Sequence, residues 1–90
     1  MDMKWIALEN RCRTVLNADG KTLSKQTVAY AILEPEWQFT RRRMLNTPLE
    51  RKYETCLEYL DRPADEVNRA VRVLNYIYAL KRGGLLKDEN

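Results

Sequence analysis

Residues 47–84 constrain the fold most, because they carry the start and stop signals of two helices. Thr47 is placed to cap the first helix: its hydroxyl accepts from the amide three residues on, while Glu50 reaches back to the Thr47 amide. Pro48 falls at the first helical position, where its missing N–H is not needed. We therefore expect a helix over about residues 48–60, ended by the Asp61-Arg62-Pro63 break.

The second of these helices is expected over about residues 64–82 and ends in cations and glycines. Lys81 and Arg82 suit the negative end of a helix dipole, and the glycines that follow supply the left-handed residue that closes many helices. Leu85 and Leu86 are expected to fold back as the hydrophobic closure of this cap. Apolar residues cover most of the girth of the helix, which predicts that it is buried on most sides.

The first half of the chain predicts three further helices, over about residues 3–16, 25–33 and 36–45. Ser24 is a sound cap for the second of them, and Pro35 ends that helix and opens the next. Residues 27–33 are also rich in β-formers, so a small hairpin over about residues 27–41 is the alternative. The expected fold is one all-α domain over residues 1–90, a compact bundle of four to five helices with a long C-terminal helix. The alternative is α+β.

Composition excludes several classes of function. The 90-residue chain has no histidine and two cysteines, Cys12 and Cys56, which fall on apolar helix faces and predict buried free thiols. These residues cannot complete a zinc site of the usual four ligands, so no metal or cofactor is expected. The sequence also contains no catalytic motif, so we do not expect an enzyme. Without a signal-peptide core or an apolar run of membrane-spanning length, the sequence predicts a cytoplasmic protein.

Residues 23–32 contain a short nucleic-acid-binding candidate. Ser24, Lys25, Gln26 and Thr27 precede Val28, and this order resembles the start of the recognition helix in helix-turn-helix repressors. The resemblance covers about ten residues. It implies that Ser24 caps and touches phosphate, while the next three side chains face the DNA groove and Gln26 pairs with adenine. The segment from residue 17 to residue 22 is longer than the usual turn of this family.

A second candidate is the run Arg41, Arg42 and Arg43. The net charge of +3 is a weak signal by itself, but no acid occurs between Trp37 and Leu49, so this segment is locally cationic. Adjacent guanidinium groups bind phosphates or an acidic protein surface. A charge run is more often a solvated helix face. Here the lack of compensating acids favours a binding role.

A third candidate is a second apolar strip on the last helix, formed by Val73, Tyr76 and Leu80 with Arg69 beside it. This strip is either part of the core or an oligomer interface, because Tyr and Arg are favoured at interfaces. A chain this short often gains stability from a second copy. The sequence alone leaves both interpretations open.

The leading functional hypothesis is a small DNA-binding regulatory protein, helix-turn-helix-like and dimeric. The alternative is a small phage or mobile-element protein that binds, and inhibits or adapts, a host protein complex such as a defence nuclease or polymerase. In that case the same arginines meet an acidic or nucleic-acid-binding surface on the partner. This alternative rests on size and composition.

Overall fold

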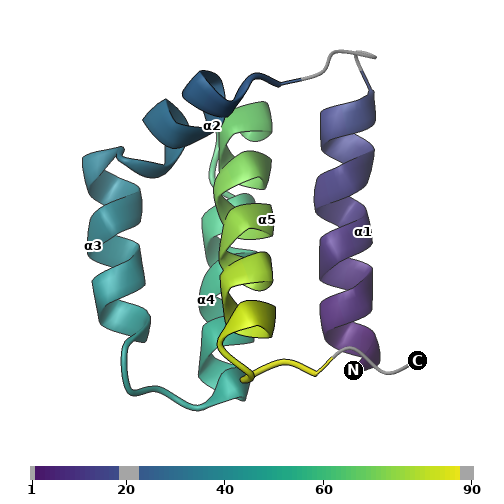
Figure 1. The fold of residues 1–90 in the computed structure, drawn as a ribbon, viewed down its shortest axis with the longest axis vertical. Coiled ribbons are helices and arrows are strands. Elements are labelled where there is room, and N and C mark those ends of the chain that lie inside the picture. Colours follow the sequence, from purple (N-terminus) through teal and green to yellow (C-terminus); the bar gives the residue numbers. More distant parts are fainter. Residues whose placement is uncertain (1, 19–22, 88–90) are drawn as a thin grey trace.

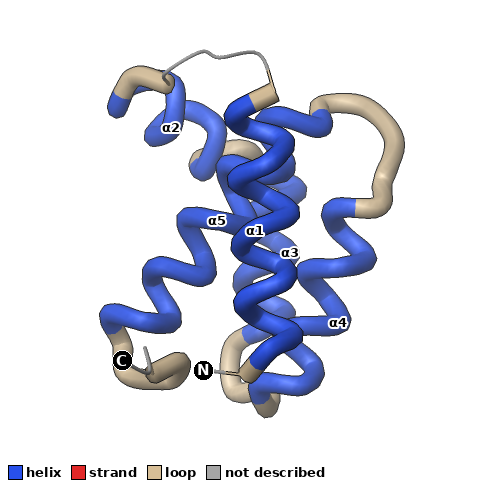
Figure 2. Tube along the Cα trace, turned by 90° about the vertical axis from the view of Figure 1, so that its right-hand side faces the viewer, coloured by secondary structure: helices blue, strands red, loops and turns tan. Residues whose placement is uncertain are grey.

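A computed structural model describes residues 2–18 and 23–87, which form five helices (Figure 1). Their bounds are α1 Met3–Asn17, α2 Lys25–Ile32, α3 Pro35–Met44, α4 Leu49–Leu60 and α5 Glu66–Arg82. The described part of the chain is helix or loop throughout, with no strand (Figure 2). The expected all-α bundle is therefore confirmed. The alternative hairpin over residues 27–41 is wrong, because α2 and α3 occupy that segment.

Helix α5 is the central element, as its apolar girth predicted. Helices α1, α2 and α4 all pack against it, and α3 packs against α4 (Figure 1). Helix α1 also contacts α4, where Trp5 meets Tyr53 edge-on with 5.5 Å between ring centroids and Lys4 pairs with Glu50. The chain's own helices thus bury most of α5, in keeping with a helix that is apolar on more than one face.

The aromatic part of the core joins α3, α4 and α5. Trp37 lies 4.8 Å from the Tyr59 ring and 6.0 Å from the Tyr76 ring, measured between ring centroids. Trp37 is fully buried, and its indole Nε1 has no hydrogen-bond partner among the described residues. This arrangement fixes the buried face of α3 and so decides which of its side chains point to solvent.

The two helix starts in the first half of the chain follow the sequence signals. The Ser24 hydroxyl accepts from the Thr27 amide at 3.1 Å, and Pro35 occupies the first turn of α3. The Glu34 carboxylate adds a cap that was not expected, because it accepts from the Glu36 and Trp37 amides, both at 2.9 Å. The local spacing of residues was enough to place α2 and α3.

The expected capping box at the start of α4 is wrong. The Thr47 hydroxyl donates to the Met44 carbonyl at 2.6 Å, at the end of α3, and gives α4 no side-chain cap. Glu50 instead forms an ion pair with Lys4 of α1. Helix α4 still begins at Leu49, because Pro48 before it has an extended conformation that allows a helix to start.

Helix α5 ends in the expected glycine cap. The Leu85 amide donates to the Leu80 carbonyl at 3.0 Å and the Gly84 amide donates to the Lys81 carbonyl at 3.1 Å, which together form a Schellman motif. Gly84 is the left-handed residue, with φ of 78°. Leu86 closes the cap as a buried side chain, whereas Leu85, expected to do the same, is 56% exposed.

Burial favours the core interpretation of the strip formed by Val73, Tyr76 and Leu80, which the sequence left open against an oligomer interface. All three are buried by the chain's own helices, and Tyr76 is only 6% exposed. Arg69, expected beside them, forms an ion pair with the Glu36 carboxylate at 3.3 Å, and its guanidinium lies over the Tyr59 ring. The strip is therefore core, because α3 and α4 already cover it.

Candidate functional site

A groove of about 520 Å³ runs between the C-terminal ends of α3 and α5. We call it the basic groove. Its lining combines cationic, amide and apolar side chains, contributed by Gln38, Arg41, Arg42, Met44, Leu45, Asn46, Lys52, Tyr76, Ala79, Leu80 and Leu85. None of these residues is an acid. The arginine run predicted as a binding segment thus contributes two of its three members to a concave surface.

The register of α3 places the arginines. Trp37, Thr40 and Met44 are buried at helical spacing, which turns Arg42 and Arg43 outward. All three arginines lie in the last turn of α3, where cations complement the negative end of the helix dipole. That stabilisation accounts for basic residues at this position, but it does not account for the apolar groove beside them.

The cations of the groove lack acidic partners. Lys4, Arg11 and Arg62 each pair with a carboxylate elsewhere on the surface, whereas the run from Arg41 to Arg43 has no ion pair with any described residue. The Arg41 guanidinium instead lies 5.7 Å from the centroid of the Tyr76 ring. Burial raises the pKa of Tyr76 to about 12, so this phenol stays neutral and contributes no compensating charge.

Lys52 is a groove residue that the sequence interpretation missed. Its side chain is buried, and its ammonium donates to the Met44 carbonyl at 3.0 Å and to both oxygens of Thr47. No carboxylate pairs with it in the described ranges. Its position gave a signal, because Lys52 lies four residues before the buried Cys56 and so shares its face of α4.

The other predicted binding residues lie elsewhere. Lys25, Gln26 and Thr27 are exposed on the first turn of α2, at the opposite end of the molecule from the loop that follows α3 (Figure 1). Ser24 uses its hydroxyl to cap the helix. Helix α2 packs chiefly on α5, so the close pairing of the recognition helix with the preceding helix, expected in a helix-turn-helix unit, is not reproduced. The structure does not bring the two predicted binding segments together.

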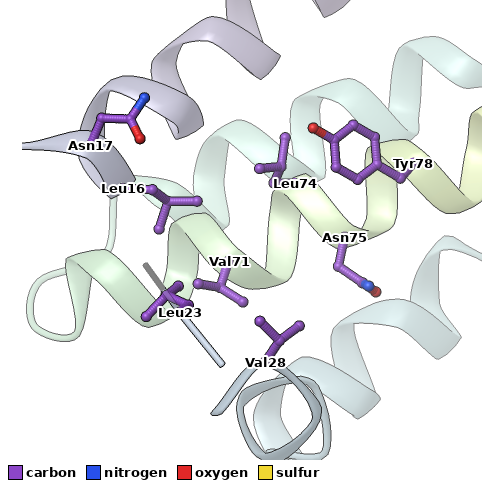
Figure 3. Close-up of a pocket in the computed structure, with 8 residues that line it drawn as sticks. All are labelled: Leu16, Asn17, Leu23, Val28, Val71, Leu74, Asn75 and Tyr78. Carbon is purple, nitrogen blue, oxygen red and sulfur yellow. The ribbon is translucent and has the colours of Figure 1, made fainter. Parts of the chain in front are cut away.

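A smaller cleft of about 350 Å³ lies between α1, α2 and α5 (Figure 3). Leu16, Val28, Val71 and Leu74 point toward one another across it, with the Asn75 amide and the Tyr78 ring at one side (Figure 3). Leu23, another lining residue, directly follows residues 19–22, which lie outside the described ranges. We assign this cleft no ligand.

Two further properties bear on function. Across residues 2–18 and 23–87, no three His, Cys, Asp or Glu side chains gather in a way that would hold a metal ion. Within the same ranges, no helix has the length and apolar character needed to cross a membrane.

No protein-family model matches this chain, and neither a curated protein nor a solved structure shows significant similarity to it. The geometry of the clefts is therefore the basis for assigning a function.

Proposed function

We propose that this chain is a small protein-binding module whose basic groove holds an acidic, partly apolar segment of a partner protein. The observation that carries the proposal is that Arg41 and Arg42, which form no ion pair with any described residue, line the same groove as exposed leucines. The Lys52 ammonium, whose N–H groups are engaged by Met44 and Thr47, adds positive charge to the groove. Leu45 is 68% exposed and Leu85 is 56% exposed. Such a groove offers ion pairs and apolar burial at once, the combination found at the centre and rim of protein interfaces.

A protein partner fits this surface better than a DNA duplex does. Binding to DNA draws mainly on phosphate contacts, which gain nothing from aliphatic side chains such as Leu45 and Leu85. A regulator that reads DNA through α2 would use a surface remote from the arginines. The DNA hypothesis is therefore the second candidate, and the same experiment tests it.

The test compares three fluorescent probes by anisotropy at two salt concentrations. They are a peptide that alternates Leu and Glu, an oligoglutamate of equal charge, and a 20-base-pair duplex. We expect the Leu-Glu peptide to bind most tightly and to weaken at higher salt, because exposed ion pairs are screened. Tightest binding to the duplex would support the DNA hypothesis instead. Equal affinity for both peptides would show that the leucines contribute nothing.

A matched pair of variants localises the binding. Arg42 lines the groove and Arg43, its exposed neighbour, does not. Arg42→Glu and Arg43→Glu change the net charge equally, so any difference between them reports the groove itself. We expect Arg42→Glu to lower the affinity for the Leu-Glu peptide about tenfold or more, the loss expected for a charge-assisted hydrogen bond. Arg43→Glu should lower this affinity much less. Equal losses would mean that the probe senses only overall charge, and the groove would be excluded as the site.

A further inference from the structure

A second cleft, of about 670 Å³, lies between α2, the start of α3 and the first half of α5. We call it the Arg72 cleft. Its lining combines four polar side chains with an apolar rim and one cation, namely Gln26, Thr27, Glu34 and Asn68, then Tyr30, Ala31, Leu33 and Pro35, and finally Arg72. It shares no residue with the basic groove, so what it binds can be tested independently of the proposed function.

Arg72 is the unusual member of this lining, because it is a charged side chain that is only 7% exposed. Its Nε donates to the Ala31 carbonyl at 2.7 Å and its Nη1 donates to the Tyr59 hydroxyl at 2.9 Å. Both acceptors are neutral, and no described carboxylate forms an ion pair with Arg72. A buried charge is expensive unless it is paired, so this guanidinium lacks the anion that burial calls for.

The unbonded edge of the Arg72 guanidinium remains reachable. Its Nη2 has no hydrogen-bond partner among the described residues. This atom is still partly accessible, because Trp37 Nε1 is the only fully buried side-chain nitrogen or oxygen without a partner in the described ranges. The two bonds from Nε and Nη1 hold the group fixed, so its remaining N–H donors keep a constant direction. A planar guanidinium held in this way is suited to a bidentate anion.

The other walls decide which anion fits. Glu34 contributes a carboxylate to the cleft, already engaged by the Glu36 and Trp37 amides, and Arg72 is the only cation among the described lining residues. A doubly charged phosphate would meet one positive and one negative group, whereas a singly charged carboxylate needs only the guanidinium. The rim adds Tyr30, which is 83% exposed, and the exposed Leu33. These apolar side chains would cover a hydrophobic body attached to the anion.

We propose that the Arg72 cleft binds an organic carboxylate that carries an aromatic or similarly large apolar group. The carboxylate pairs with the free edge of Arg72, and the apolar group lies against Tyr30 and Leu33. Gln26 and Asn68 flank the cleft with amide donors. Such a carboxylate is offered both by the C-terminus of a peptide that ends in an aromatic residue and by a free aromatic acid.

The experiment titrates the ¹⁵N-labelled chain with four probes and follows the backbone amides of Gln26, Thr27 and Asn68 and the Arg72 side chain by NMR. The probes are N-acetylphenylalanine, 3-phenylpropanoate, the neutral N-acetylphenylalaninamide and inorganic phosphate. We expect saturable shifts with both carboxylates and at least tenfold weaker binding of the amide and of phosphate. Tighter binding of N-acetylphenylalanine than of phenylpropanoate would identify a peptide C-terminus, and the reverse a free acid. Either order supports a carboxylate site.

Replacing the buried Arg72 could unfold the chain, so the cleft is tested with isosteric variants of its other residues. Gln26→Glu and Asn68→Asp each add a negative charge to the cleft. We expect each to lower the affinity for the carboxylate probes about three- to tenfold by repulsion. Asn10→Asp on the exposed face of α1 makes the same change outside the cleft and should leave affinity unaltered. The proposal is overturned if the neutral amide or phosphate binds as tightly as the acids, or if Gln26→Glu and Asn68→Asp both bind like the unmodified chain.

Discussion

Burial controls the chemistry of individual side chains, and the two cysteines show it most directly. Burial raises the pKa of Cys12 to about 11 and that of Cys56 to about 12. At pH 8 the reactive thiolate form is therefore about one part in a thousand or less. We expect neither thiol to react with a disulfide reagent in the folded chain, and both to react after denaturation. Rapid labelling of the native protein would contradict the buried positions that the helical spacing predicted.

The same thiols make stability depend on pH in the alkaline range. Their ordinary pKa is 9.0, so above that value the unfolded chain loses thiol protons that the folded chain retains. The unfolded state then binds fewer protons, and the free energy of unfolding falls as pH rises. We expect urea midpoints to be steady below pH 9 and to fall between pH 9 and 11. In a variant with Cys56→Ala the decline should be shallower, and an equal slope would remove Cys56 as its cause.

Trp37 carries a buried polar atom, its indole Nε1, that has no hydrogen-bond partner among the described residues. Trp37→Ala should destabilise the chain by about 3–5 kcal/mol, as large truncations in cores do. Trp37→Phe also removes volume, but it eliminates the orphan N–H, which costs about 1–3 kcal/mol when buried. We expect Trp37→Phe to lie within about 1.5 kcal/mol of the unmodified chain in urea unfolding. If Trp37→Phe lost as much stability as Trp37→Ala, the indole N–H would have a hydrogen-bond partner in solution.

Among the elements, local signals predicted helices well and their bonding partners less well. Ser24 and Pro35 act within a few residues of themselves, so sequence spacing was enough to place α2 and α3. Thr47 has the right spacing for a capping box, yet its hydroxyl and carbonyl are engaged by Met44 and Lys52. Met44 and Lys52 are local competitors for Thr47, whereas Glu50, the other half of the expected capping box, pairs with Lys4 of α1, a tertiary contact that spacing along one helix cannot show.

The glycine cap of α5 provides a test at this scale. Gly84 has a φ of 78°, and a Cβ added there would meet nothing within 4 Å. The cost of Gly84→Ala is therefore conformational alone, about 1–2 kcal/mol for a left-handed residue with a side chain. Gly84→Asn should cost less, because Asn tolerates this region better. Thermal unfolding would measure both, and an Ala variant as stable as the original would place the left-handed residue elsewhere.

For the molecule as a whole, the sequence identified the arginine run but not the surface to which it belongs. Arg41 and Arg42 acquire their apolar neighbours Leu80 and Leu85 from α5 and the turn that follows it, about 40 residues away in sequence, as the groove lining shows. Arg72 and its cleft were likewise missed, because an arginine on a long helix gives no local sign of being buried between α2 and α4. The separation of α2 from the arginines also depends on the path of α3, which spacing does not encode.

The burial of the strip formed by Val73, Tyr76 and Leu80 leads to the last prediction, made for the whole fold. Tyr76→Glu removes the ring that packs on Trp37 and buries a carboxylate in its place; although the Arg41 guanidinium lies beside that ring, the lost packing and the desolvation of a buried charge outweigh the new ion pair. Small domains have about 5–15 kcal/mol of stability in total, so we expect this variant to lose most of its helical circular dichroism. Tyr30→Glu, at a tyrosine that is 83% exposed, is the matched control and should melt like the unmodified chain. If Tyr76→Glu stayed folded and only changed its sedimentation, the strip would be an interface between copies after all.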